Sequence, residues 1–366
     1  MKTHNKNKSM KYNPLFIKSI HFSVSIFGLL IVINTSILTA QNQKMEKTSI
    51  EPAKPWLDNK GNHINAHGGG VLFHNGIYYW YGEHKIKGKS EANFADGGIH
   101  CYTSKDLINW TDGGIVLSVD YSNSTNSDIE YGCLIERPKV VYNKKTQKFI
   151  AFFKFYPKGN GYEVAYVGVA TSESPNGPFI YSHKFLADSP KGSGDFSMFV
   201  DTNGDLYHLA VRKPDKTFII GKMRDDYLMP LDGYKICNGI EYHTEAPALI
   251  KVNNVYHMLN SGSTGWKPNE ARYYTTNDLF GTWTRHENPT HGFNPVDNIG
   301  SEKTFGGQSS FIIPVMGLEN AYIAMFDIWK PTIPIEGRYI WLPIEFKEGK
   351  ISIQWMDQWN VSFFKK

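Results

Sequence analysis

The stretch EYHTEAPALIKVNNVYHMLNSG, Glu241–Gly262, decides the fold. β-Branched and aromatic residues fill both of its halves, and Asn253-Asn254 between them tolerates the left-handed dihedral angles of a tight turn. The pattern therefore predicts two antiparallel strands joined by a hairpin. One carboxylate, Glu245, stands directly before the apolar run of the first strand. Burying such a group is costly unless it faces a polar cavity, so Glu245 is a candidate functional residue.

The same outline recurs in four other places: a polar residue, an apolar strand, a turn and an aromatic strand. The polar residues that begin these four units are His67, Glu136, Asp195 and Gln308. Five strand-rich units at intervals of roughly 50 to 70 residues predict an all-β fold, a single five-bladed β-propeller. The innermost strand of each propeller blade lines the central axis, so we expect the five polar residues to converge there in an active site. The alternative is that they are unrelated strand-start residues that cap backbone groups.

The first 40 residues have the layout of a secretory signal peptide. Five lysines precede the apolar run Ser23–Leu38, and Thr39-Ala40 follows it. Residues 41–55 are a polar linker in this interpretation, and residues 56–366 form the propeller. We therefore expect a secreted or periplasmic protein whose mature domain has no membrane contact. An uncleaved membrane anchor is the alternative, although the apolar run is short for a span.

Charge and cysteine content exclude several classes of function. The formal net charge is +4, and the five leader lysines account for more than this excess, which leaves the mature chain close to neutral. Such a domain has no electrostatic footprint for nucleic acid. The three cysteines, Cys101, Cys133 and Cys237, lie far apart, so a zinc or redox site is not indicated and at most one disulfide can form. We expect no cofactor or catalytic metal, although a structural ion on the propeller axis is compatible with the pattern, and we expect a monomer.

What remains is carboxylate chemistry in an aromatic-rich cavity, which is what glycoside hydrolysis requires. A neutral carboxylic acid protonates the departing oxygen, and a second group activates water on the opposite face of the sugar. The acid must keep its proton near neutral pH, so it needs a desolvated site or a nearby negative charge. Glu245 has apolar neighbours, and convergence with Asp195 and Glu136 would raise its pKa.

These residues resemble glycoside hydrolase family 43, whose fold is a five-bladed β-propeller. The resemblance implies that Glu245, in Thr-Glu-Ala-Pro-Ala, is the general acid at the head of blade four. It implies that Asp195, at the head of blade three, tunes the pKa of the acid and orients it. The likeness extends over nearly the whole mature chain.

One departure from the family is informative. The usual general base is an aspartate at the head of blade one, where this chain has His67 followed by three glycines, and the usual histidine of blade five is replaced by Gln308. The exo-β-1,3-galactanase subgroup shares these features, together with segments similar to Trp80–Glu83, Glu136–Lys139 and Trp341–Pro343. That likeness implies that Glu136 contacts and assists the substrate and that Gln308 holds the attacking water. An amide is a very poor base, so a purely structural Gln308 and a basic His67 are the alternatives.

A sugar site also needs a flat apolar face and hydroxyl-binding groups. Trp266 lies on a glycine-hinged loop just after the Glu245 hairpin and is the candidate stacking platform, unless it only anchors that loop. The other candidate substrate-binding residues are His67, Glu83, Arg137, Glu241 and Ser263. Arg137 can instead pair with a carboxylate.

The sequence thus predicts an exo-acting glycosidase that acts on an oligo- or polysaccharide. The subgroup resemblance implies release of galactose from β-1,3-galactan with inversion. An α-L-arabinofuranosidase or β-xylosidase of the same family is one alternative. A sugar-binding propeller without catalysis is the other, because the aspartate base is missing.

Overall fold

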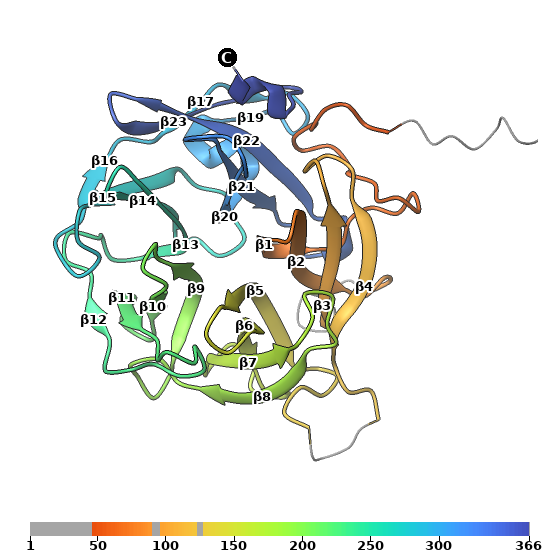
Figure 1. The fold of residues 1–366 in the computed structure, drawn as a ribbon, viewed down its shortest axis with the longest axis vertical. Coiled ribbons are helices and arrows are strands. Elements are labelled where there is room, and N and C mark those ends of the chain that lie inside the picture. The colour runs from red at the N-terminus through yellow and green to blue at the C-terminus, as the bar shows by residue number, and fades with distance from the viewer. Residues whose placement is uncertain (1–45, 90–95, 123–126, 366) are drawn as a thin grey trace, which may run out of the picture. The chain divides into compact units, whose positions relative to one another are not determined.

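Five antiparallel sheets, each built on four strands that follow one another in the chain, surround a central axis (Figure 1). The structure is a computed structural model that describes residues 46–89, 96–122 and 127–365. The predicted five-bladed β-propeller is confirmed. The expected signal peptide, residues 1–40, lies outside the described residues. Within the described ranges, no helix is both long enough and apolar enough to cross a membrane.

The first three blades are regular four-stranded antiparallel sheets. Their strands are β1 (His67–His74), β2 (Ile77–Lys85), β3 (Asp96–Ser104) and β4 (Thr111–Ser118), then β5 (Leu134–Asn143), β6 (Lys148–Tyr156), β7 (Tyr166–Ser172) and β8 (Ile180–Phe185), then β9 (Ser193–Val200), β10 (Leu206–Arg212), β11 (Phe218–Lys222) and β12 (Lys235–Ile236). In each blade the first strand is the inner one, beside the axis (Figure 1).

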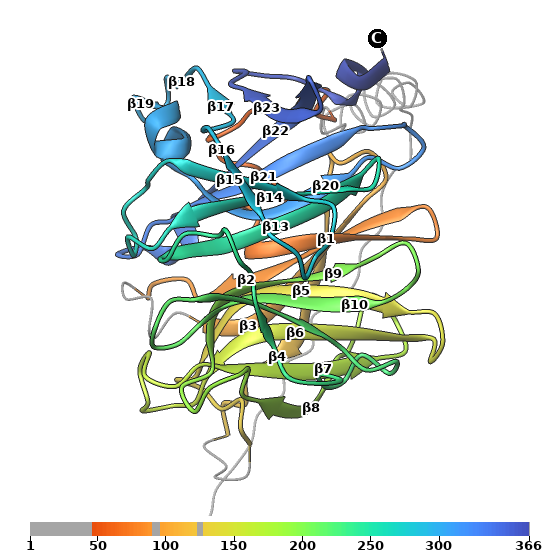
Figure 2. The same ribbon diagram turned by 90° about the vertical axis from the view of Figure 1, so that its left-hand side faces the viewer.

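Blades four and five carry the remaining strands and the short 3-10 helices. The strands are β13 (Thr244–Val252), β14 (Val255–Gly262), β15 (Ala271–Thr276) and β16 (Thr284–His286), then β20 (Gln308–Pro314), β21 (Tyr322–Ile328), β22 (Arg338–Lys347) and β23 (Lys350–Gln354). The segment between the two blades contains β17 (Thr290–His291), β18 (Phe293–Asn294), β19 (Ile299–Gly300) and η2 (Ser301–Gly306). The helix η3 (Pro334–Glu336) lies between β21 and β22, and η4 (Val361–Lys365) follows β23. The β17 strand pairs in parallel with β23, and both lie near β19 in the two ribbon views (Figures 1 and 2).

Each inner strand has an irregularity at or just after its polar head. In β5, for example, Glu136 pairs with Lys154 and Lys139 pairs with Phe152, so two residues of β5 face one residue of β6. Equivalent register shifts occur in the other four blades. Such bulges bend a strand and re-aim its side chains. The repeated outline in the sequence is therefore a repeated bulge that turns the head of each inner strand relative to the strand that follows.

The glycines after His67 let the backbone of β1 pack closely against β2. Gly68 has a φ of +59°, and a Cβ there would lie 2.4 Å from the Glu83 carboxylate. A Cβ on Gly69 would lie 1.8 Å from the backbone oxygen of Tyr81. Neither position can carry a side chain.

The first described residues hydrogen-bond to the last blade and to the segment that follows it. The backbone of Ile50 exchanges two hydrogen bonds with Trp359, and the Ala53 amide donates to the Tyr339 oxygen over 2.8 Å. Residues from Lys47 onward belong to the compact propeller unit. The prediction that residues 41–55 are a linker is therefore wrong for their second half. Because the segment is polar overall, the sequence did not indicate that Ile50 and Ala53 are buried.

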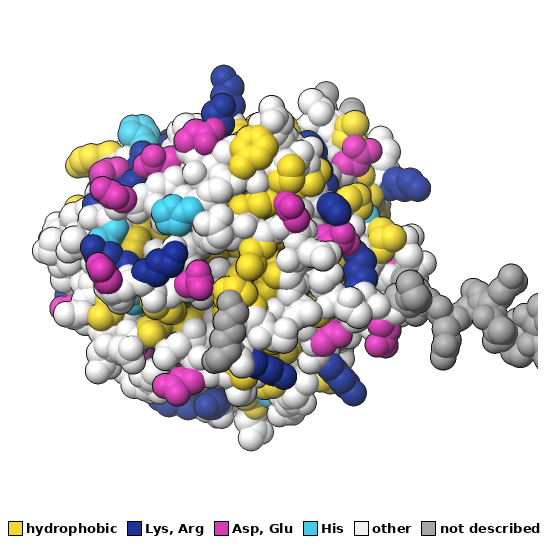
Figure 3. Space-filling view, turned by 90° about the horizontal axis from the view of Figure 1, so that it is seen from above, with side chains coloured by type: hydrophobic (Ala, Val, Ile, Leu, Met, Phe, Trp, Pro, Cys, Tyr) yellow, Lys and Arg dark blue, Asp and Glu magenta, His cyan; other side chains and the backbone are white. Residues whose placement is uncertain are grey.

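Aromatic side chains fill the interface between the first and last blades. Trp80 is fully buried, and its ring centroid lies 4.6 Å from those of both Trp341 and Tyr339 and 5.3 Å from that of Trp110. Contacts of this geometry add to the hydrophobic gain of burial. The outer face shown in Figure 3 carries interspersed acidic and basic side chains.

All three cysteines are free and buried. Burial raises the pKa of Cys133 and Cys237 to about 12, and that of Cys101 further. Protonated, inaccessible thiols are inert. The disulfide that the sequence left open is not formed.

Candidate active site

A cavity of about 220 Å³ opens where the inner strands begin. It is small beside the roughly 300–1,000 Å³ of sites for drug-sized ligands, so it suits a single sugar ring better than a chain of them. Four of the five predicted heads line it. The lining residues are Glu83, Glu136, Arg137, Lys154, Tyr162, Asp195, Glu245, Gly265, Trp266, Gln308 and Trp329.

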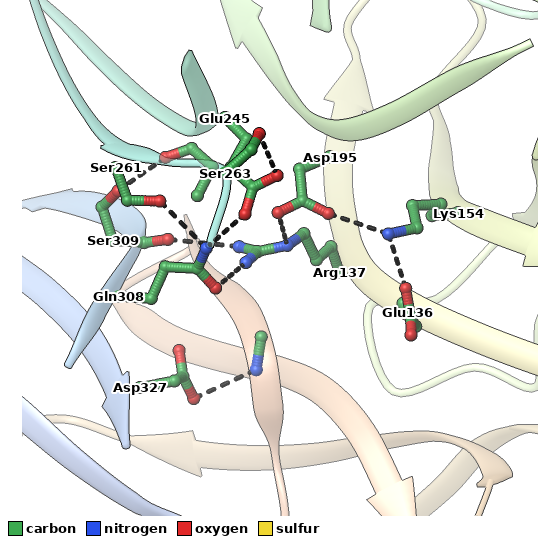
Figure 4. Close-up of polar contacts among 12 residues, drawn as sticks. Glu136, Arg137, Lys154, Asp195, Glu245, Ser261, Ser263, Gln308, Ser309 and Asp327 are labelled. Atoms are coloured by element: carbon green, nitrogen blue, oxygen red, sulfur yellow. Dashed lines mark hydrogen bonds and ion pairs between the residues drawn. The ribbon is translucent and has the colours of Figure 1, made fainter. Parts of the chain in front are cut away.

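Glu245 is held by two hydrogen-bond donors at the start of β13. The Ser263 hydroxyl donates to one carboxylate oxygen over 2.6 Å, and the Gln308 amide nitrogen donates to the other over 3.0 Å (Figure 4). Burial, and then the negative charge of Asp195, raises the pKa of Glu245, while Ser263 and Arg137 oppose the shift. The net effect favours a carboxyl group that keeps its proton, as a general acid must.

Asp195 lies beside Glu245 but is held in the opposite state. Its two carboxylate oxygens contact Arg137 Nε at 2.9 Å and Lys154 Nζ at 2.8 Å (Figure 4). Burial by itself favours the neutral acid, but the two positive charges outweigh it and hold the pKa of Asp195 well below its usual value. Two neighbouring carboxyl groups whose environments push their pKa values apart are the arrangement expected of an acid and its charged modulator.

Gln308 has a fixed amide orientation. Its nitrogen donates to Glu245 and, over 2.9 Å, to the Ser261 hydroxyl. Its oxygen accepts hydrogen bonds from Arg137 Nη2 at 2.5 Å and from the Trp329 indole at 2.8 Å. All the hydrogen-bonding capacity of the amide is therefore engaged with protein groups. To hold a water molecule, Gln308 must exchange one of these bonds.

Glu136 forms an ion pair at the blade-two side of the cavity. Its carboxylate contacts Lys154 Nζ at 2.6 Å, and the same ammonium continues to Asp195 (Figure 4). The sequence predicted that Glu136 would raise the pKa of Glu245. In the structure burial and Asp195 are the leading causes, because the charge of Glu136 is taken up by Lys154.

Arg137 connects two of the four catalytic candidates, Asp195 and Gln308. It is 4% exposed, and besides Asp195 and Gln308 it donates to the Ser309 backbone oxygen over 3.1 Å. Its guanidinium also stacks over the Trp329 ring at 5.6 Å. Arg137 lines the cavity, so a contact with substrate is possible there, but its donors already serve Asp195 and the oxygens of Gln308 and Ser309.

Two of the other predicted binding residues line the cavity and one acts on the acid. Glu83 is buried, with Lys85 Nζ at 2.9 Å and the Arg137 amide donating to it over 2.8 Å. Trp266 is 45% exposed and packs edge-on against Trp329, with ring centroids 5.7 Å apart. Ser263 bonds Glu245 directly and does not line the cavity.

The remaining two candidates lie away from the cavity. His67 is 1% exposed and stacks on Tyr339, and burial lowers its pKa well below the usual value, so its ring is neutral. The Glu241 side chain is 54% exposed and lies 3.7 Å from Arg272 and from Arg285. Neither placement brings the side chain to the cavity. The loop before Glu245 carries Glu241 aside, and the ring of His67 packs against Tyr339 although the same kind of bulge follows it as follows Glu136.

Sequence reasoning missed Lys154, Tyr162 and Trp329. Lys154 could have been recognised in the sequence, because it is the one charged residue in the aromatic run Phe149–Tyr156. In the structure it pairs across the sheet with Glu136. Trp329 directly follows β21. The loop that carries Tyr162 showed no periodic pattern to mark it. Among the described residues, no group of three His, Cys, Asp or Glu side chains could hold a metal ion.

The pairing of a buried carboxyl group that keeps its proton with a neighbouring ionised carboxylate, in a cavity of a five-bladed propeller, is the arrangement of a glycosidase. The profile of the glycosyl hydrolases family 43 matches residues 70–311, and the chain belongs to that family. No curated protein matches the chain.

Solved structures of the family superimpose on most of the chain. A GH43 β-1,3-galactosidase solved with galactodeoxynojirimycin is 37% identical, with a TM-score of 0.78, and the match covers 85% of this chain and all of the other. The exo-β-1,3-galactanase of Phanerochaete chrysosporium, solved with galactose, is 30% identical, with a TM-score of 0.73 and coverage of 86% and 68%. The exo-β-1,3-galactanase 1,3Gal43A of Clostridium thermocellum is 32% identical, with a TM-score of 0.72 and coverage of 85% and 66%. The chain thus spans about two thirds of the length of these two enzymes.

Proposed function

We propose that the protein is an exo-acting hydrolase that releases galactose from β-1,3-galactan with inversion of configuration. The observation that carries the proposal is the buried carboxyl group of Glu245, whose pKa is raised and which the Gln308 amide holds at 3.0 Å in a cavity of the size of one sugar ring. The similar enzymes described above, named as β-1,3-galactosidases and exo-β-1,3-galactanases, support this choice of substrate.

In the proposed reaction Glu245 gives its proton to the glycosidic oxygen as the bond to the departing sugar breaks. The charge of Asp195 keeps that proton on Glu245 until then. Water attacks the opposite face of the galactose ring, and Gln308 positions it after exchanging one of its present hydrogen bonds. The oxygen of Gln308, polarised by Arg137 and Trp329, orients the water but is too weak a base to take its proton outright. Glu136, whose carboxylate lines the same cavity, contacts the substrate and takes the proton that the water loses as its oxygen bonds to the sugar. That proton then passes through solvent to restore the acid form of Glu245.

The shape of the cavity supports action at a chain end. Its small volume and the buried charge network at its floor leave room for a terminal residue, while Trp266 at the exposed side offers a flat face to the sugar that follows. A cleft open at both ends would be needed to bind the middle of a polysaccharide.

Secretion belongs to the same proposal. A galactan is too large to enter a cell intact, and the basic and then apolar layout of residues 1–40 supports export to the periplasm or the medium. We propose that the exported domain works as a monomer on its polysaccharide.

The decisive experiment is hydrolysis of β-1,3-galactan and β-1,3-galactotriose, with the anomer of the first-formed galactose followed by proton NMR. We expect galactose as the sole early product, released as the α-anomer. A β-anomer would overturn inversion. Cleavage of aryl arabinofuranosides or xylosides alone would overturn the substrate. Saturable binding of galactan without any reducing sugar would identify a binding protein.

A further inference from the structure

A fully buried ammonium group lies on the propeller axis beneath the catalytic cavity. Lys139 of β5 is 2% exposed. Its Nζ donates to the backbone oxygens of Gly68 at 2.9 Å, Arg137 at 3.3 Å and Pro138 at 3.4 Å. The three donors of an ammonium thus meet three carbonyl acceptors, one from β1 and two from β5.

The fold makes room for this side chain. A Cβ on Gly70 would lie 3.0 Å from Lys139 Cδ and 3.1 Å from the Phe311 ring, so the third glycine of the run gives the lysine stem its path. The stem lines a second cavity of about 830 Å³ at the opposite end of the axis. The head of Lys139, at the oxygen of Gly68, points from that cavity toward the catalytic one.

The carbonyls that Lys139 binds belong to the bulges of β1 and β5. Within the β5 bulge Arg137 has a φ of +51°, a left-handed conformation that a side chain other than glycine adopts at a cost. The surroundings hold it on both sides. Glu83 accepts its amide hydrogen at 2.8 Å, and Lys139 donates to its oxygen.

The strained residue is the one whose side chain organises the site. The Arg137 guanidinium contacts Asp195 at 2.9 Å and Gln308 at 2.5 Å (Figure 4). A small rotation of the backbone at Arg137 is amplified at the end of its long side chain. The two hydrogen bonds that hold the Arg137 backbone, its amide to Glu83 and Lys139 to its oxygen, therefore decide whether its side chain can make both of these contacts at once.

We propose that Lys139 is a positioning residue, whose buried Nζ ties the bulges of β1 and β5 together through their carbonyl oxygens and thereby aims Arg137 at Asp195 and Gln308. The inference rests on the proposed function, because its effect is read on glycoside hydrolysis. Burial, and then repulsion by Arg137, lowers the pKa of Lys139 to about 7, while Asp327, Glu83 and Asp195 oppose the shift. The charged form of Lys139 is stabilised by the three carbonyl oxygens that accept its hydrogen bonds.

The test compares Lys139→Met, which fills the space without donors, with Lys139→Ala, which leaves the space empty. We expect kcat on galactotriose to fall by up to about 100-fold in both, the size of effect that follows from slight misplacement of catalytic groups. Galactose affinity, measured by the fluorescence of the tryptophans at the site, is expected to change far less than kcat. Lys144→Met removes an exposed lysine at the rim of the second cavity and should leave kcat unchanged.

Chemical rescue separates positioning from general damage. Ethylammonium can enter through the second cavity and donate to the vacated carbonyls, so it should restore several-fold activity to Lys139→Ala. It should not help Lys139→Met, and tetramethylammonium, which has no N–H group, should help neither. Undiminished kcat in Lys139→Met, or the absence of rescue in a Lys139→Ala variant with wild-type folding, would overturn the proposal.

Two controls keep the outcome interpretable. If the lysine variants do not fold, Gly70→Ala displaces the lysine stem by a few tenths of an ångström. That variant should show the same selective loss of kcat in milder form, and unchanged kcat in it would count against the inference. If the wild type does not cleave galactan, the proposed substrate is wrong, and the comparison is then made on whichever aryl glycoside the wild type does cleave.

Discussion

Four of the five inner strands begin at a charged cavity, and all five continue into a more apolar one. At their starts Asp195, Glu245 and Gln308 form one hydrogen-bonded network with Arg137. Beyond the bulges, aliphatic and aromatic side chains of the same strands line the second cavity. The bulge at each head is the boundary between the two regions. We expect from this contrast that substitutions at the charged end alter chemistry, whereas substitutions of the aliphatic and aromatic side chains at the apolar end alter only stability.

The largest effect is expected at the acid itself. Glu245→Gln removes the proton donor while keeping the shape of the side chain, so hydrolysis of galactan should fall by about 10²- to 10⁴-fold. Binding of galactose should persist. An activated aryl galactoside, whose leaving group needs no proton, should lose much less activity. Equal losses on both substrates would mean that Glu245 has a different role.

The next largest effect is expected at the amide. Gln308→Ala should lower turnover of good and poor leaving groups alike, by about 100-fold, because water must be placed correctly in both reactions. Azide should partly restore activity by occupying the vacated space, and the sugar azide should have inverted configuration, which NMR of the product would establish. Near-normal turnover of this variant, combined with inactivity of Glu136→Ala, would show that Gln308 does not position the water.

A smaller and pH-dependent effect is expected at the modulator. Asp195→Asn removes a negative charge that raises the pKa of Glu245 and leaves Arg137 without its carboxylate partner, while Lys154 keeps only Glu136. Both changes lower the pKa of Glu245, so the acid loses its proton at a lower pH. The alkaline limb of the profile of kcat/KM against pH should move toward acid, with activity recovering as the pH falls. An unmoved limb would show that Asp195 acts through orientation alone.

The charged end could be predicted from the sequence only where a residue heads a repeated strand. Glu136, Asp195, Glu245 and Gln308 stand at equivalent places in the repeat, and all four reach the cavity. Their cross-strand partners were not predicted, because the register between two strands depends on the bulge between them. Lys154 and Ser261 come to the site in this way, opposite Glu136 and Glu245.

Two of the predicted binding residues, Glu241 and His67, do not line the cavity. Glu241 lies only a few residues before the acid, but the intervening loop turns it toward Arg272 and Arg285. His67 heads its strand and is followed by the same kind of bulge as Glu136 and Glu245. Its ring nevertheless packs against Tyr339 instead of lining the cavity. The head position and the bulge after it therefore do not by themselves decide which side chain enters the cavity.

The smallest effect on catalysis is expected at the apolar end of the strand that carries the acid. Leu249 lies four residues beyond Glu245 in β13, is 8% exposed and lines the second cavity. Leu249→Ala should lower the free energy of unfolding by about 2 kcal/mol, the low end of the range for such truncations, because the side chain borders an open cavity rather than a closed core. The midpoint of denaturant unfolding should fall, while kcat/KM stays within about twofold of the wild type, since no member of the charged network touches Leu249. Val200→Ala, at an exposed position on the same cavity, should change stability by less than about 0.5 kcal/mol. A tenfold loss of kcat/KM in a folded Leu249→Ala protein would show that packing at one end of the strand controls the aim of Glu245 at the other, and the separation of the two regions would fail.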